Sequence, residues 1–134
     1  ESAMIYVASS KRAHAQAQEA CVRLGQSCIR VTSTWHREPL DQTVEADPYK
    51  RLALANRCYR EIRQSAGLLL LAHTDMRGAI AEVGYALGIG CEVYAVGNAA
   101  EHTLMLAPIT WAETIEALIP RLRRARGRYA GGTT

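Results

Sequence analysis

The segment from Gly78 to Gly88 holds the residues best suited to chemistry. It follows the apolar run Leu68-Leu-Leu-Leu-Ala72, and its spacing predicts a helix that opens behind a buried strand. Gly78 would let a ligand approach the backbone, and the free N–H groups of the first helical turn would bind an anion or sugar hydroxyls. Glu82 would lie one turn into this small, apolar helix, with its carboxylate near the strand ends. The alternative is a first-turn Glu that only complements the helix dipole.

A second polar cluster, Ser9-Ser10-Lys11-Arg12, follows the apolar residues 4–8. Hydroxyl groups, N–H groups and two cations at the start of a helix suit a phosphate. Capping of the helix by Ser9 or Ser10, followed by a solvated basic turn, explains the same residues equally well.

Other common site classes find no support in the spacing. No G-x-G-x-x-G, G-x4-G-K-[ST] or G-x-S-x-G motif occurs. The cysteines and histidines have no metal-ligand spacing, so we expect no metal and no cofactor. We interpret the cysteines as small buried hydrophobes of a reducing compartment, and therefore expect a cytoplasmic protein. They are Cys21, Cys28, Cys58 and Cys91.

Hydrophobic periodicity predicts the elements that must position these residues. Strands are expected at residues 4–8, 28–32, 68–72 and 92–96, with a short fifth strand around residues 104–106. Helices are expected from Ser9 or Ser10 to Gly25, from Asp47-Pro48 onward, at residues 79–88 and from the capping box at Thr110. Residues 33–46 are expected to form a loop, and Pro120 to kink the last helix. The predicted apolar face of the second long helix comprises Leu52, Ala55, Cys58, Tyr59 and Ile62.

Alternating strands and helices predict an α/β fold, a flavodoxin- or Rossmann-like three-layer sandwich with about five parallel strands. Ligands bind such sheets at the carboxyl ends of the strands, near the switch in strand order. We therefore expect the site at three strand ends: Ala8-Ser9-Ser10, residues 73–78 and Gly97-Asn98.

Length and composition limit the number of domains and the class of protein. The 134 residues are 49% apolar and 22% charged, as in one ordinary globular domain. The longest apolar run is too short to cross a bilayer, and no signal peptide is recognisable. We expect residues 1–3 to be a cloning remnant, residues 4–126 to be the domain and residues 127–134 to be a mobile tail.

The net charge of +3 is unevenly distributed. Five arginines between Arg121 and Arg128 have no acid after them, which leaves −2 on residues 1–120 (3 − 5). Such a tail can bind nucleic acid, but a solvated last helical turn is the favoured interpretation, because no aromatic residues alternate with the arginines.

Taken together and in order, four segments resemble the nucleoside 2-deoxyribosyltransferase superfamily, including its nucleotide N-glycosidase branch. The segments are Met4-Ile-Tyr-Val-Ala-Ser-Ser10, Val31-Thr-Ser-Thr-Trp35, Gly78-x3-Glu82-x-Gly84-Tyr-Ala86 and Val93-Tyr-Ala-Val-Gly97. The resemblance extends over residues 4–119, and the third segment is its most specific part.

The resemblance implies an enzyme that cleaves the N-glycosidic bond of a nucleoside or nucleoside 5′-monophosphate. Glu82 would be the nucleophile that forms a covalent glycosyl-enzyme, and Tyr6 would orient its carboxylate. Water or a second base would then take the sugar. The family also implies a homodimer or larger homo-oligomer, no membrane and no cofactor.

Three positions depart from the family pattern. Cys58 falls where the family has an Asp that orients the sugar and base, and Ala66 falls where a further acid ends that helix. The family often has an Asp directly before the Gly of its Gly-x3-Glu motif, where this chain reads Asp75-Met-Arg-Gly78. Asp75 is the first candidate for the general acid that protonates the base, and His73 is the second.

The remaining candidates would contact the ligand from loops. Trp35 and His36 could stack on a base, or Trp35 could be a lid packed on the domain. Asn98 could contact the ligand or simply make a turn. A phosphate at Ser9–Arg12 would favour a nucleotide over a nucleoside as the substrate. Because the two family acids are missing, a non-catalytic nucleotide-binding protein on the same fold is the alternative function.

Overall fold

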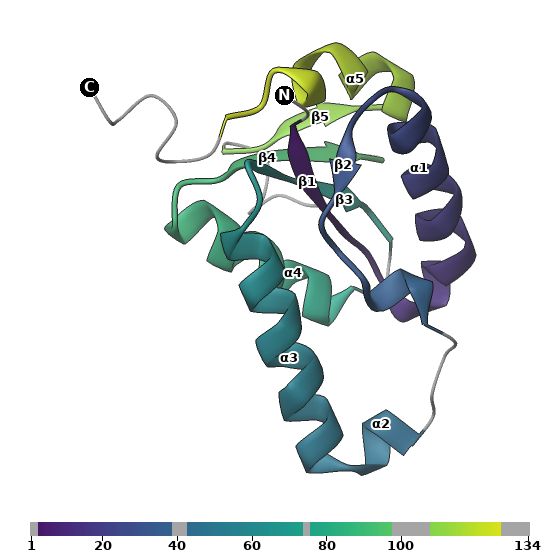
Figure 1. Cartoon of the computed structure of the whole chain (residues 1–134), viewed down its shortest axis with the longest axis vertical. Helices are drawn as coiled ribbons and strands as arrows, with labels where there is room; N and C mark the ends of the chain where they lie inside the picture. The colour runs from purple at the N-terminus through teal and green to yellow at the C-terminus, as the bar shows by residue number, and fades with distance from the viewer. Residues whose placement is uncertain (1–2, 39–42, 74–75, 98–107, 127–134) are drawn as a thin grey trace.

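The computed structural model describes residues 3–38, 43–73, 76–97 and 108–126 and contains one parallel five-stranded sheet. The strand order is β2-β1-β3-β4-β5, and every adjacent pair is parallel (Figure 1). The strands are β1 (Met4–Ala8), β2 (Arg30–Val31), β3 (Gly67–Leu71), β4 (Glu92–Val96) and β5 (Thr110–Ala112). This is the flavodoxin-like order, and it confirms the predicted α/β fold.

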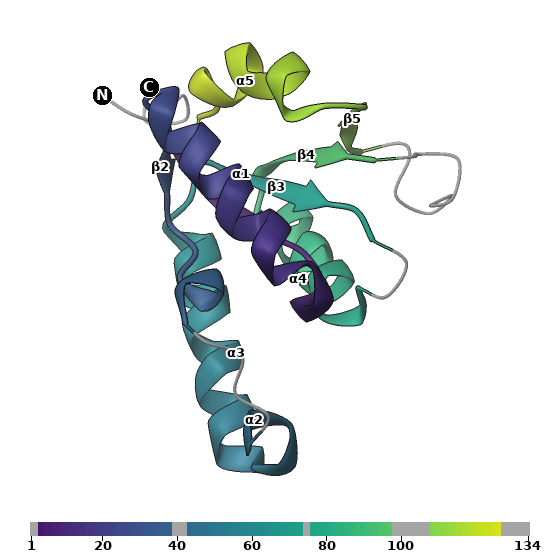
Figure 2. The ribbon, with the colours of Figure 1, turned by 90° about the vertical axis from the view of Figure 1, so that its right-hand side faces the viewer.

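Helices cover both faces of the sheet. They are η1 (Lys11–Ala13), α1 (His14–Gln26), η2 (Trp35–Arg37), α2 (Thr43–Ala46), α3 (Pro48–Arg63), α4 (Arg77–Gly88) and α5 (Ile115–Arg123). Helices α1 and α5 pack on one face and α3 and α4 on the other, as Figure 2 shows from the side. The predicted cap of α3 is present, because the Asp47 carboxylate accepts from the N–H groups of Tyr49 and Lys50.

Alternation along the strands divides the core into two layers. Tyr6 and Leu68 point to the α3/α4 side, whereas Ile5 and Leu69 point to the α1/α5 side. All four side chains are fully buried. Tyr6 is therefore the buried hydroxyl of β1 that faces α3 and α4.

Several predicted boundaries are wrong. Gly25 lies inside α1, and the chain reverses at Cys28, which adopts φ 63° and is exposed rather than buried. The segment expected to be a loop contains η2 and α2, which the irregular apolar pattern of residues 33–46 does not reveal.

The last helix also begins later than predicted. Thr110 starts strand β5, because its backbone pairs with Tyr94 of β4. Thr114 caps α5 instead, with its hydroxyl accepting from the N–H of Ala117. Pro120 lies inside α5 as expected. The fifth strand expected around residues 104–106 lies outside the described residues, as does the tail.

Helix α3 projects beyond the sheet at its N-terminal end, together with α2 (Figures 1 and 2). Leu52, a member of the predicted apolar face, is 59% exposed there and is not covered by the described part of the chain. Among the described helices, none has the length and apolar character needed to cross a membrane.

Candidate active site

Two predicted site residues meet on the α3/α4 side of the sheet. The Tyr6 hydroxyl on β1 donates a hydrogen bond to a carboxylate oxygen of Glu82 on α4. Tyr6 is fully buried and Glu82 is half-buried. Because β1 and β3 adjoin where the strand order reverses, and α4 follows β3, the pair lies at the switch point where such folds bind ligands.

Cys58 of α3 is the third member of this cluster. It is buried, and a hydrogen bond from its thiol to Glu82 lowers the pKa of the Glu82 carboxyl. From the sequence, Cys58 is only the replacement of an acid. The structure places a neutral donor, the Cys58 thiol, against the Glu82 carboxylate.

The pKa values of the three groups are all raised, but only that of Glu82 lies near neutral pH. Burial raises the pKa of Glu82 to about 7, although its hydrogen bonds to Tyr6 and Cys58 act in the opposite direction. Burial, with the nearby Glu82 charge, also raises the pKa of Tyr6 far above its ordinary value. Burial raises the pKa of Cys58 to about 11. Near neutral pH Tyr6 and Cys58 therefore remain donors, while Glu82 alone exchanges its proton.

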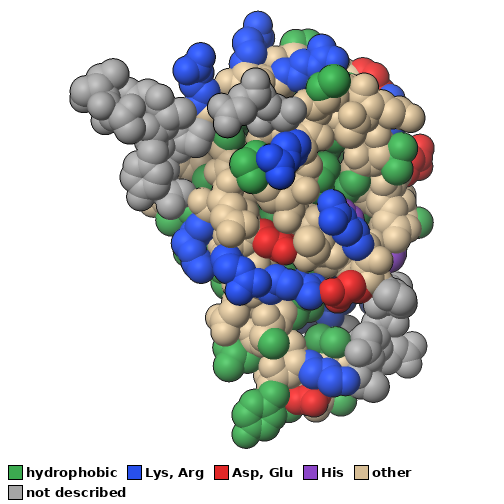
Figure 3. All heavy atoms as spheres, in the orientation of Figure 1, with side chains coloured by type: hydrophobic (Ala, Val, Ile, Leu, Met, Phe, Trp, Pro, Cys, Tyr) green, Lys and Arg blue, Asp and Glu red, His purple; other side chains and the backbone are tan. Residues whose placement is uncertain are grey.

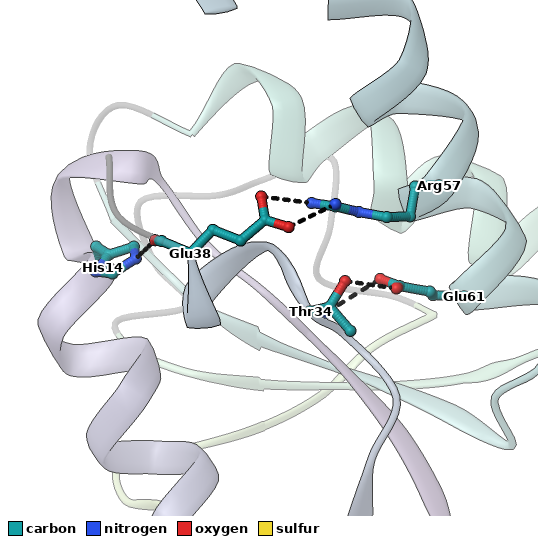
Figure 4. A network of polar contacts seen from close by, with 5 residues as sticks. All are labelled: His14, Thr34, Glu38, Arg57 and Glu61. Atoms are coloured by element: carbon teal, nitrogen blue, oxygen red, sulfur yellow. Dashed lines mark hydrogen bonds and ion pairs between the residues drawn. The ribbon is translucent and has the colours of Figure 1, made fainter. Parts of the chain in front are cut away.

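A second buried carboxylate, Glu61, anchors the segment that follows β2. Its two oxygens accept from the N–H of Thr34 at 3.1 Å and from the Thr34 hydroxyl at 2.6 Å (Figure 4). Arg57, one turn earlier on α3, binds both carboxylate oxygens of Glu38 at 2.7 and 3.1 Å. His14 of α1 contacts the Glu38 carbonyl oxygen at 2.8 Å. This network, which ties η2 to α1 and α3, was not predicted from the sequence.

The network positions Trp35, whose indole N–H donates to the Val7 carbonyl at 2.8 Å. The ring is half-buried and packs against both core layers. Its neighbour His36 is only 2% exposed and lies 2.9 Å from the Ser33 hydroxyl, so the suggestion that His36 stacks on a base is wrong. Burial lowers the pKa of His36 to about 4.

The serines at the end of β1 serve the backbone. Ser9 donates to the Leu71 carbonyl at 2.8 Å, and Ser10 accepts from the N–H of Arg12 at 3.2 Å as the cap of η1. Both serines are buried, whereas Lys11 and Arg12 are exposed. The capping interpretation is thus present in the structure, and phosphate binding by this segment stays a prediction.

The glycines beside the site differ in what they tolerate. A Cβ built on Gly78, in the first turn of α4, meets no atom within 4 Å, so this position is open. A Cβ on Gly97 would lie 2.8 Å from the Cβ of Ala72, and its φ of +142° also demands glycine. Ala8 is fully buried at the end of β1.

Three further candidates from the sequence are Asp75, Asn98 and His73. Asp75 and Asn98 lie outside the described residues. His73 is half-buried, and its backbone N–H donates to the Met76 sulfur at 3.4 Å. Within the part of the chain that the structure describes, no group of three His, Cys, Asp or Glu side chains could hold a metal ion.

Comparison with known proteins supports the fold but identifies no family. No family model matches the sequence, and no curated protein matches it. A solved structure titled "Solution Structure of BlsM" is similar, with a TM-score of 0.61 and 12% sequence identity over 92% of this chain and 88% of that chain. This chain therefore shares the fold of that protein.

Proposed function

We propose that this protein cleaves the N-glycosidic bond of a nucleoside or nucleoside 5′-monophosphate, with Glu82 as the nucleophile. The contact between the Tyr6 hydroxyl and the Glu82 carboxylate at the switch point is the observation that supports this most. The resemblance of the Gly78-x3-Glu82 segment to the nucleoside 2-deoxyribosyltransferase superfamily supports the choice of substrate class.

The reaction has two steps. An oxygen of ionised Glu82 bonds to the anomeric carbon, while the bond to the base breaks and its electron pair goes to the base nitrogen, which gains a proton. Water or a second base then attacks the anomeric carbon, and Glu82 leaves as the carboxylate. Loss of a proton from the attacking water or base completes this step. Asp75 is our first candidate for protonating the leaving base, and His73 is the second.

The neighbouring groups divide the remaining roles. Tyr6 and Cys58 donate to Glu82 and favour its ionised form, which is the form that attacks. Trp35 and Asn98 would contact the base, Gly78 and Ala8 would leave room for the sugar, and Ser9 and Ser10 would lie near a 5′-phosphate. A phosphate preference and the choice between water and a second base belong to this proposal.

A panel incubation tests it. Wild-type protein is incubated with nucleosides and their 5′-monophosphates, and free base is measured by chromatography. Glu82→Ala should lower release by several orders of magnitude, more than about 4 kcal/mol of barrier. Glu92→Ala, which removes an exposed carboxylate of β4, is the matched control and should leave the rate unchanged. Release that survives Glu82→Ala would contradict the mechanism.

A non-catalytic nucleotide-binding protein is the second candidate. Cys58 favours it, because a neutral thiol with a pKa of about 11 stands where the family has a carboxylate. Saturable nucleotide binding with no base released from any member of the panel would select this alternative.

We also propose that the chain forms a homodimer or larger homo-oligomer through α3 and α4. Leu52 of α3 and Ile80 of α4 are 59% and 47% exposed, and Tyr49 is 85% exposed. Large apolar side chains exposed on neighbouring helices are suited to burial against a second copy.

A further inference from the structure

A polar groove lies on the flank of the molecule, away from the Glu82 cluster. It has a volume of about 490 Å³ and lies between β2, the segment that follows β2, and the C-terminal end of α3. The residues that line it include two arginines, Arg30 and Arg37, the hydroxyl-bearing Thr32 and Thr34, and Gln64. None of its seven lining residues is acidic.

The groove is separate from the candidate active site. It shares no residue with the cluster of Tyr6, Cys58 and Glu82. Helix α3 contributes Cys58 to the cluster, and its C-cap residue Gln64 lines the groove. These positions are six residues apart in the chain, or about 9 Å along a helix axis.

The two arginines of the groove differ from other arginines on this side of the protein. Arg57 is bound to Glu38, and Arg63 donates to the Tyr85 hydroxyl at 3.0 Å. Arg30 and Arg37 are exposed, and no described residue forms a hydrogen bond or ion pair with either guanidinium. Two positively charged residues therefore line the groove with no direct partner among the described residues.

Two described acids of this region, Glu61 and Glu38, are already engaged in hydrogen bonds. Glu61 lies behind Thr34, and its carboxylate accepts both the N–H and the hydroxyl of that residue. Glu38 forms its two bonds with Arg57. Figure 3 shows Lys and Arg side chains gathered across this face, over β2 and α3. The local charge thus favours an anion, although the rest of the body is mildly acidic.

We propose that this groove is a second binding site, which takes a small phosphate-bearing anion. Guanidinium groups bind phosphate oxygens through paired N–H donors, and two such groups can share one phosphate or diphosphate. The volume falls within the range of small-ligand sites rather than extended macromolecular surfaces. This site does not depend on the function proposed for Glu82.

Titration of ¹⁵N-labelled protein with inorganic pyrophosphate at constant ionic strength tests the proposal. Saturable shifts are expected at the amides of Val31, Thr32, Thr34 and Gln64. The double variant Arg30→Gln/Arg37→Gln should bind at least about 10-fold more weakly, because both charge-assisted pairs are lost. Arg51→Gln, an exposed arginine of α3 outside the groove, should bind within about 2-fold of wild type.

Parallel titrations identify the source of the phosphate and distinguish the groove from the Glu82 cluster. Adenosine 5′-monophosphate that binds the same amides more tightly than pyrophosphate identifies the ligand as a nucleotide, and weaker binding identifies it as the phosphate group itself. Glu82→Gln should leave the affinities for pyrophosphate and for adenosine 5′-monophosphate, both measured at the groove amides, unchanged, because Glu82 does not line the groove. The outcome therefore does not depend on the glycosidase proposal.

Three results would overturn the proposal. The first is a shift that never saturates or is equal in the double variant. The second is saturable binding confined to the amides of residues 9–12. The third is tighter binding of an oligothymidylate that extends to Arg60 and Arg63 and weakens steeply with salt, which would make this face a nucleic-acid surface.

Discussion

The Glu82 carboxylate is held between two opposing effects. Burial favours its neutral form, while hydrogen bonds from Tyr6 and Cys58 favour the anion. The balance gives a pKa of about 7 instead of 4.5. A small change at either donor therefore changes the fraction of protein that carries an ionised nucleophile at neutral pH.

The raised pKa has a consequence for stability. The folded state holds the Glu82 proton more tightly than the unfolded state, so this contribution to stability is complete below about pH 4.5 and is lost as pH rises through about 7. Glu82→Gln cannot ionise. The free energy of unfolding of the variant should therefore exceed that of wild type by on the order of 1–3 kcal/mol at pH 8.5, with a much smaller difference at pH 5.

Urea unfolding of both proteins at the two pH values measures that difference. Glu92→Gln, at an exposed carboxylate, is the control for general effects of charge removal. A Glu82→Gln difference that is the same at pH 5 and pH 8.5 would show that Glu82 does not titrate in the folded state as described.

Tyr6→Phe isolates the donated hydrogen bond. Without the hydroxyl, the pKa of Glu82 should rise, so that ionisation and kcat/KM both move to higher pH. The loss, roughly 10- to 1000-fold, should be larger at pH 6 than at pH 9. A ¹³C titration of the Glu82 carboxyl follows the same change without requiring turnover. Tyr94→Phe, which removes the tyrosine paired with Glu92, should leave both curves in place. Equal losses at every pH would assign Tyr6 a packing role.

At this scale the sequence identifies some partners and misses others. Tyr6 and Glu82 could be identified from the sequence, because Tyr6 lies in the apolar run 4–8 and Glu82 lies in the segment that follows the apolar run 68–72. The contacts of Cys58 and Glu61 could not, since they depend on the rotation of α3 against β1 and on the path of the chain after β2. A Glu on an otherwise apolar helical face, at Glu61-Ile62, was the only available signal.

The end of α1 carries a measurable strain. Cys28 is exposed and adopts φ 63°, a region that costs a side-chain-bearing residue roughly 1–2 kcal/mol. Cys28→Gly removes that cost and adds some backbone entropy to the unfolded chain, so a net gain of about 0.5–1 kcal/mol is expected. Ser27→Gly, next to it at φ −98°, relieves nothing and should destabilise. The Tm values of the two variants should shift in opposite directions from that of wild type. A lower Tm for Cys28→Gly would refute the backbone strain at Cys28.

Among the elements, burial determines what the sequence reveals. Strands β1, β3 and β4 are apolar on both faces, so short runs such as residues 68–72 identify them directly. Strand β5 was missed because Thr110-Trp-Ala-Glu113 resembles a helix cap. Its pairing with β4 through Ala95 and Trp111 outweighs that local preference.

At the scale of the whole molecule, the projecting end of α3 bears directly on self-association. If Leu52 and Ile80 lie in an interface between copies, charges at both positions should disrupt it. Leu52→Glu/Ile80→Glu should elute as a monomer in light scattering where wild type is a dimer or larger. Val22→Glu, at a 60% exposed apolar residue of α1, should retain the wild-type mass. A monomeric wild-type protein at concentrations of about 100 μM would contradict the proposal.

The strand order determines which residues can meet. Because β1 lies between β2 and β3, α3 and α4 cover the same face of β1, and Cys58 and Glu82 reach Tyr6 from two different helices. The sequence predicted the parallel sheet, and a site at the strand ends stays a prediction. It did not predict the hydrogen bonds from Thr34 to the Glu61 carboxylate, which join α3 to the segment after β2.

Covalent trapping tests the central claim most directly. A 2′-fluoro-substituted nucleoside 5′-monophosphate slows both steps by destabilising the oxocarbenium-like transition state, and hydrolysis of the ester can become the slower step. Intact mass spectrometry should then show one added glycosyl phosphate per chain, and peptide mapping should assign it to Glu82. The adduct should be absent from Glu82→Gln and present in Glu92→Gln. Release of free base by wild type with the label on another residue, or an adduct that persists in Glu82→Gln, would contradict the account.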